Sequence, residues 1–98
     1  HMAESPVAAF AAVHCAAATE NLIAMEHHFV DVDWWDDLVT GVEKPIIQDG
    51  YIKVPEGPGL GIELNEDVVK EHLNPKGSGY FEPTTQWDVD PANDRLWS

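Results

Sequence analysis

The stretch from Ser5 to Glu26 decides the expected fold, and it reads Ser-Pro-Val-Ala-Ala-Phe-Ala-Ala-Val-His-Cys-Ala-Ala-Ala-Thr-Glu-Asn-Leu-Ile-Ala-Met-Glu. Ser5 and Pro6 are typical of the N-cap and the first position of a helix. Residues 6–18 carry no charged side chain, and a helix that is apolar all round is buried on most sides. We expect residues 22–25 to form a short buried strand that ends at Glu26. A strand with two apolar faces is typical of a parallel sheet covered by helices, so the stretch predicts one helix–strand unit of a larger α/β fold.

The charge of the chain limits the possible partners. Eighteen acidic and five basic residues give the 98-residue chain a formal net charge of −13, which argues against nucleic acid and anionic membranes as partners. Such acidity suits either a salt-rich cytoplasm or an acidic domain with a basic partner. The acids are spread along the chain instead of forming a tail, which favours the salt-adapted interpretation. A lone Cys15 and the lack of a run of 18 apolar residues predict a soluble, cytoplasmic protein.

The chain divides into three predicted parts. Residues 1–40 contain the helix, the strand and an acidic, Trp-containing loop with one or two helical turns after Asp33. Residues 41–73 contain a hairpin with Asp49-Gly50 as its two-residue turn, a Pro/Gly loop and a short helix with Asn65 as N-cap. Residues 74–98 form an irregular aromatic tail.

Three stretches carry a resemblance to a known family. Ser5-Pro-Val-Ala with the Ala-rich helix, residues 18–26 and above all residues 49–65 resemble the C-terminal end of the mandelate racemase/muconate lactonizing enzyme group of the enolase superfamily. Its sugar-acid dehydratases are the most similar members, and the resemblance covers roughly residues 1–73. It implies a modified (β/α)7β barrel of the TIM type, of which residues 1–40 would be the last helix and strand. The hairpin and short helices would then pack near the N-terminal capping domain.

The resemblance also implies an activity. Enzymes of this group bind Mg²⁺ through carboxylates on the middle strands, and the metal steadies the enediolate formed when a base removes the proton next to the substrate carboxylate. In the dehydratases a neighbouring hydroxyl group then leaves. Because 98 residues offer one candidate barrel strand, we expect the metal ligands outside this chain and no activity from the chain alone. Its expected partners are a sugar-acid substrate, the remainder of the barrel with the capping domain, and further copies in a homo-oligomer.

Three residues are candidates for the site. His1 precedes Pro6-Val-Ala by the spacing that the family has after a catalytic His, which implies a catalytic acid or base; a vector-derived His-Met is the alternative. Glu26 falls where the family places a glutamate that hydrogen-bonds the substrate carboxylate or its enediolate, with structural pairing to a barrel cation as the alternative. Burial there would favour the protonated form of Glu26. Trp35 is a candidate to cover the sugar, weighed against core packing.

Other interpretations compete with this one. A local metal site would draw on His27, His28, Asp31 and Asp33, but a solvated acidic loop explains these residues better, and we predict no metal ligand in the chain. The alternative function from another class is a non-catalytic acidic interaction module that offers tryptophans to a protein partner. The apolar helix at the start of the chain favours the barrel fragment, because such a helix is a liability in a free module.

Overall fold

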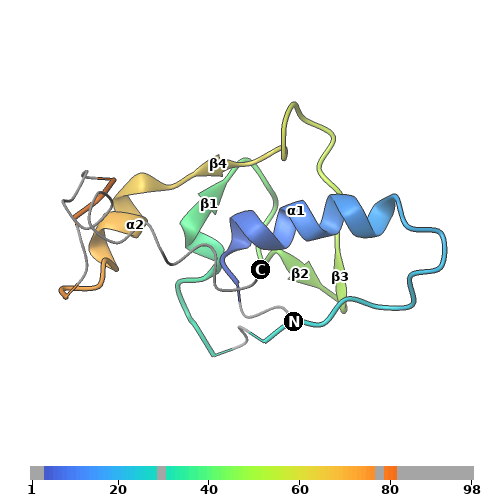
Figure 1. Cartoon of the computed structure of the whole chain (residues 1–98), viewed down its shortest axis with the longest axis horizontal. Coiled ribbons are helices and arrows are strands. Elements are labelled where there is room, and N and C mark those ends of the chain that lie inside the picture. The colour runs from blue at the N-terminus through green and yellow to red at the C-terminus, as the bar shows by residue number, and fades with distance from the viewer. Residues whose placement is uncertain (1–3, 29–30, 77–78, 82–98) are drawn as a thin grey trace, which may run out of the picture.

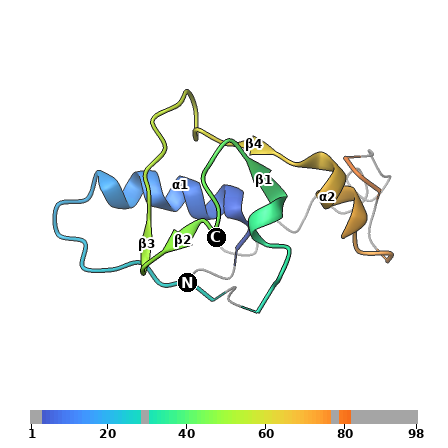
Figure 2. The ribbon, with the colours of Figure 1, turned by 180° about the vertical axis from the view of Figure 1, so that it is seen from behind.

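The computed structural model of the chain describes residues 4–28, 31–76 and 79–81 (Figure 1). Along the chain lie helix α1 (Pro6–Ala17), the 3-10 helix η1 (Asp36–Leu38), strands β1 (Val39–Thr40), β2 (Ile47–Gln48), β3 (Tyr51–Ile52) and β4 (Glu63–Leu64), and helix α2 (Glu66–Glu71). In the described part, the strands form two antiparallel pairs, β1 with β4 and β2 with β3. Helix α1 runs in front of β2 and β3 in Figure 1 and behind them in the reverse view of Figure 2, so it covers one side of that pair.

Helix α1 begins where the sequence predicts. Pro6 occupies its first turn, and the backbone N–H of Ala9 donates to the carbonyl of Ser5 at 3.0 Å, although the Ser5 side chain makes no capping hydrogen bond. The buried residues of the helix form one stripe, namely Pro6, Ala9, Phe10 and Val13. Ala11, Cys15 and Ala17 are exposed. The expected burial on most sides is therefore absent, because within the described residues this helix is covered along a single stripe.

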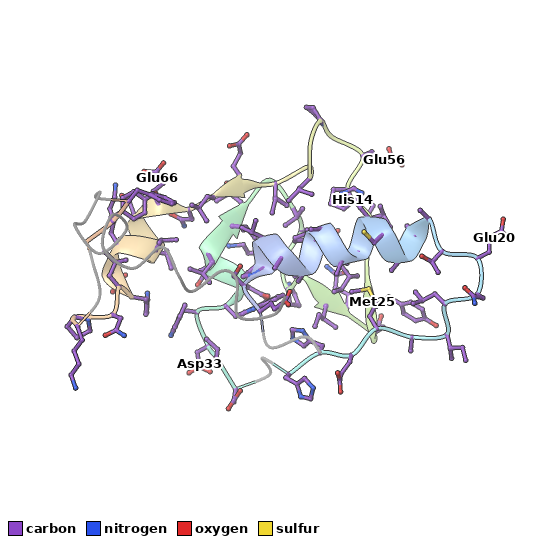
Figure 3. The ribbon with its side chains drawn as sticks, in the orientation of Figure 1. His14, Glu20, Met25, Asp33, Glu56 and Glu66 are labelled. Carbon is purple, nitrogen blue, oxygen red and sulfur yellow. The ribbon has the colours of Figure 1, made fainter. Side chains whose placement is uncertain are left out.

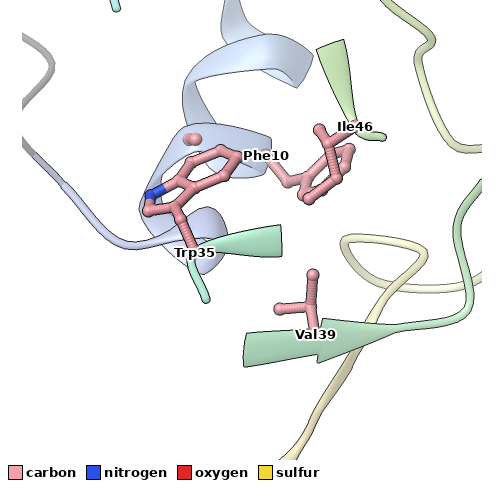
Figure 4. Packing of buried hydrophobic residues seen from close by; sticks show 5 residues of the cluster. Phe10, Trp35, Val39 and Ile46 are labelled. Carbon is pink, nitrogen blue, oxygen red and sulfur yellow. The ribbon is translucent and has the colours of Figure 1, made fainter. Parts of the chain in front are cut away.

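A small apolar core holds the described elements together. Its buried members are Ala9, Phe10, Trp35, Val39 and Ile46, which come from α1, the segment before η1, β1 and the segment before β2 (Figure 4). Val39 is fully buried on the short strand β1, which follows η1 directly. The core thus joins helix α1 to residues 35–46.

The strand predicted over residues 22–25 is not formed in the structure of this chain. Residues 22–28 belong to no helix or strand, and the side chain of Ile23 is 99% exposed. A strand in a parallel sheet needs neighbours that accept and donate its ladder hydrogen bonds. Within the described ranges no strand pairs with this segment, and Leu22 and Ile23 stay exposed.

The hairpin and the second helix are confirmed. Asp49 and Gly50 have φ values of 51° and 82°, which is the pattern of a type I′ turn, and Ile47 pairs with Ile52 across it. Helix α2 is a short helix, as predicted, with Asn65 at the N-cap position. The backbone N–H of Asn65 donates to the carbonyl of Leu38 at 2.8 Å, whereas the Asn65 side chain makes no capping bond. This backbone bond fixes the start of α2 against η1.

Of the one or two helical turns predicted after Asp33, the structure shows the single 3-10 turn η1. Next to this turn, the ring of Trp34 stacks on that of His72 at 4.0 Å with an interplanar angle of 21°. Close to it in the sequence, Lys70 Nζ lies 4.8 Å from the centroid of the Tyr80 ring. Loss of hydration and then a hydrogen bond to Glu66 raise the pKa of Tyr80. Aromatic side chains therefore contact Lys70 of α2 and its C-cap residue His72.

The loop between β3 and β4 offers a matched test of the fold. Gly59 and Gly61 both have positive φ, at 64° and 73°, but a Cβ at Gly59 would meet open space while one at Gly61 would collide with the Pro55 ring. We expect Gly59→Ala to lower the free energy of unfolding by about 1–2 kcal/mol, the cost of a left-handed conformation. Gly61→Ala should cost about 1–3 kcal/mol more because of the collision. Urea unfolding of both variants measures the difference, and equal losses would contradict the loop structure.

Candidate functional site

A groove next to Glu26 is the most promising place for a site. It has a volume of about 630 Å³ and lies between the second half of α1, residues 22–27 and the β2–β3 hairpin. Its lining includes Val13, Met25 and Glu26, and Figure 3 shows Met25 on the segment that passes below α1. The groove is mostly apolar along its walls, so a carboxylate at its edge is a distinctive feature.

Glu26 lies in an open environment. Its side chain is 57% exposed, and Oε1 lies 3.0 Å from Nε2 of His28, an ion pair when that imidazole is protonated. Hydrogen bonds to neighbouring positively charged groups, His28 among them, and the charge of those groups lower the pKa of the Glu26 carboxyl. The burial that would favour the protonated form is absent from the described part of the chain. The catalytic and substrate-binding roles of Glu26 stay predictions.

Trp35 lies in the core instead of the groove. Its side chain is part of the buried cluster with 4% exposure, and its indole Nε1–H donates to the carbonyl of Glu4 at 2.9 Å. The His27 ring meets the indole edge to face, with centroids 4.9 Å apart and an interplanar angle of 70°. This position fits the packing alternative, and a substrate contact of Trp35 stays a prediction.

The described residues do not fit a magnesium site. No three His, Cys, Asp or Glu side chains come together in the ranges that the structure describes. Mg²⁺ favours several oxygen ligands in octahedral geometry, so no step can be assigned to a metal held by these residues. His27 and His28 turn to different partners, Trp35 and Glu26. His1, the other predicted catalytic residue, lies outside the described residues.

Two histidine contacts were missed by sequence reasoning. His14 is half-buried, and its Nε2 lies 3.1 Å from the carbonyl oxygen of Leu60, which joins α1 to the Pro/Gly loop. His27 was expected in a solvated loop, but it packs against Trp35. Neither partner could be predicted from the sequence, because no local pattern encodes a contact across a loop.

Among the described residues, no helix has the combined length and apolarity needed to span a membrane.

Comparisons with known proteins identify the class. A family model for the enolase C-terminal domain-like proteins matches residues 1–68. D-xylonate dehydratase of Haloferax volcanii is 41% identical over 73 residues, which are 74% of this chain and 17% of that protein. Muconate cycloisomerase 1 of Rhodococcus opacus is 37% identical over 68 residues, which are 68% of this chain and 17% of that enzyme. No solved structure matches the chain.

These matches define an α/β barrel-type protein of the enolase superfamily. The chain belongs to the enolase C-terminal domain-like family, as the resemblance in its sequence predicted. It spans 17% of the length of each of the two curated relatives.

The exposure of Glu26 gives a stability test of its role. Because the Glu26–His28 pair is open to solvent on both sides, its contribution to stability is small. We expect Glu26→Gln to leave the urea midpoint of the chain unchanged, while Val39→Ala, at a fully buried position, lowers it clearly. A marked fall in the midpoint for Glu26→Gln would favour the structural alternative for this carboxylate.

Proposed function

We propose that the chain is the C-terminal part of an acid-sugar dehydratase, a lyase of the enolase superfamily. The observation that carries the proposal is the 41% identity to D-xylonate dehydratase across 73 residues, nearly three quarters of the chain. In this proposal residues 1–40 are the last helix and strand of a modified (β/α)7β barrel. Residues 41–73 pack near the capping domain, and residues 74–98 form a tail.

The exposed apolar surface of the chain supports this assignment. Leu22 and Ile23 are 46% and 99% exposed on an extended segment, and they flank the groove along α1. Contiguous exposed apolar surface marks a place where another element packs. Neighbouring barrel strands would supply the missing hydrogen bonds of residues 22–25 and would cover these side chains.

The chemistry assigned to this chain centres on Glu26. In the assembled barrel its carboxyl would hydrogen-bond the carboxylate of a sugar acid or the enediolate that replaces it. Loss of water around Glu26 would raise its pKa from the lowered value of the open segment, and a protonated carboxyl can donate to a developing oxyanion. By resemblance, His1 would act as acid or base. Mg²⁺ belongs to the proposal only as a metal held by residues outside this chain.

A chimera tests the proposal. Residues 1–73 replace the aligned segment of Haloferax volcanii D-xylonate dehydratase, and Mg²⁺-dependent loss of water from D-xylonate is assayed. We expect an active chimera. Glu26→Gln should lower kcat about 100-fold, the usual loss when one group that stabilises an oxyanion is removed. Glu20→Gln is the matched control, since Glu20 is exposed at the far end of α1 and points away from the groove (Figure 3).

Three outcomes would each contradict a part of the proposed function. A folded chimera that leaves sugar acids unchanged would contradict a dehydratase role, and cycloisomerisation of muconate by that chimera would favour the reaction named for the second relative. An unchanged kcat for Glu26→Gln would remove Glu26 from the site while leaving the family membership intact.

We also propose that the protein is adapted to a salt-rich, reducing cytoplasm and works as a homo-oligomer. The net charge of −13 supports the adaptation to salt, and the free, exposed thiol of Cys15 supports a reducing compartment.

The thermal midpoint of the chain should rise as KCl increases from about 0.1 to 2 M, because salt screens repulsion between carboxylates. A variant with Glu20→Lys, Glu56→Lys and Glu71→Lys, three exposed positions, should show a smaller rise. Equal salt dependence of the two proteins would contradict the adaptation.

A further inference from the structure

The indole of Trp35 contacts two segments that the proposed site needs. Its Nε1–H donates to the carbonyl of Glu4, immediately before Ser5 and the start of α1, at 2.9 Å. Its ring meets the ring of His27, the residue that follows Glu26, at 4.9 Å. One buried side chain therefore links the entrance of the helix to the end of the 22–28 segment.

Trp35 is itself firmly held. Its side chain is 4% exposed and packs in the core with Phe10 and Val39 (Figure 4). Its backbone N–H donates to Val32 at 3.0 Å, and its carbonyl accepts from Leu38 at 3.3 Å. An indole fixed by packing and by hydrogen bonds at backbone and ring has little freedom to move, so it can serve as a reference point for its neighbours.

The segment that carries Glu26 has a different kind of support. Residues 22–28 belong to no sheet in the described ranges, and the Glu26–His28 pair is open to solvent. His27, by contrast, is half-buried against Trp35. The edge-to-face contact therefore anchors this segment to the core at the residue next to Glu26.

We propose that Trp35 is a positioning residue: through His27 and Glu4 it fixes where Glu26 stands relative to the start of α1. The inference rests on the proposed function, in which Glu26 contacts the substrate. It assigns Trp35 an indirect role in place of direct contact with the sugar. A misplacement of about 1 Å in a catalytic site can cost on the order of 100-fold in rate, so loss of one such anchor is measurable.

Two variants of the chimera test the proposal from both sides of the contact. Trp35→Phe keeps an aromatic ring in the core but removes the N–H and part of the surface facing His27. His27→Leu removes the contact from its half-buried side and leaves Trp35 in place. We expect each variant to lower kcat about tenfold with KM within twofold, and to have no further effect in a Glu26→Gln background. Losses that are equal in both backgrounds would overturn the proposal, because residues that act through one another are not additive.

Trp34→Phe is the matched control. Trp34 is the neighbour of Trp35 in sequence, but it is 37% exposed and stacks on His72 instead. In NMR spectra of the 98-residue chain, Trp35→Phe should shift the ring protons of His27 and the side-chain signals of Glu26. Trp34→Phe should shift those of His72 alone. Unchanged His27 and Glu26 signals in Trp35→Phe would overturn the positioning role.

The two arms separate the inference from the function beneath it. A wild-type chimera without activity would contradict the proposed function, while the NMR comparison would still decide whether Trp35 sets the position of Glu26. An active chimera whose kcat is the same in Trp35→Phe and in the parent would overturn the inference and leave the dehydratase assignment standing.

Discussion

The packing of the Trp35 indole against α1 is the contact on which the described structure depends. It joins the helix to the segment before η1, and through Phe10, Val39 and Ile46 it extends to β1 and the approach to β2. The hydrogen bond from Nε1 to Glu4 fixes the direction in which the chain enters the helix. Buried tryptophan combines a large apolar surface with a single polar group that must find an acceptor, so its position is specified twice, by shape and by hydrogen bonding.

Sequence reasoning succeeded where the signal is local. Asp49-Gly50 specifies its turn because both residues tolerate positive φ, and the hairpin follows within two residues on either side. The Ser5-Pro6 start of α1 and the acidic first turn of α2 are equally local, and both helices are present. The capping hydrogen bonds themselves are not formed, since the side chains of Ser5 and Asn65 make no bond to the helix N-termini. The residue types mark a helix start without fixing which hydrogen bond completes it.

Sequence reasoning failed where the structure depends on distant partners. Residues 22–25 have the composition of a buried strand, but a strand is a relation between two segments, and its neighbours are missing from the described chain. The same reason explains the one-sided burial of α1. The contacts of His27 with Trp35 and of His72 with Trp34 cross loops, and no periodicity encodes them. For the candidate site, the sequence therefore proposed Glu26 but could not predict its surroundings, namely the exposed pair with His28 and the neighbouring groove.

This dependence on distant partners bears on the chemistry as well as on the fold. In the open segment, neighbouring positive charge lowers the pKa of Glu26, and the carboxylate faces water. Donation to an enediolate oxygen requires the opposite state, a proton held by burial and by other anions. In the proposed function Glu26 would therefore not act alone, because the barrel strands proposed to cover residues 22–25 would also reverse the electrostatics of Glu26. In this proposal strand pairing and acid strength would be two consequences of one assembly step, and the contact between Trp35 and His27 would hold Glu26 in position for it.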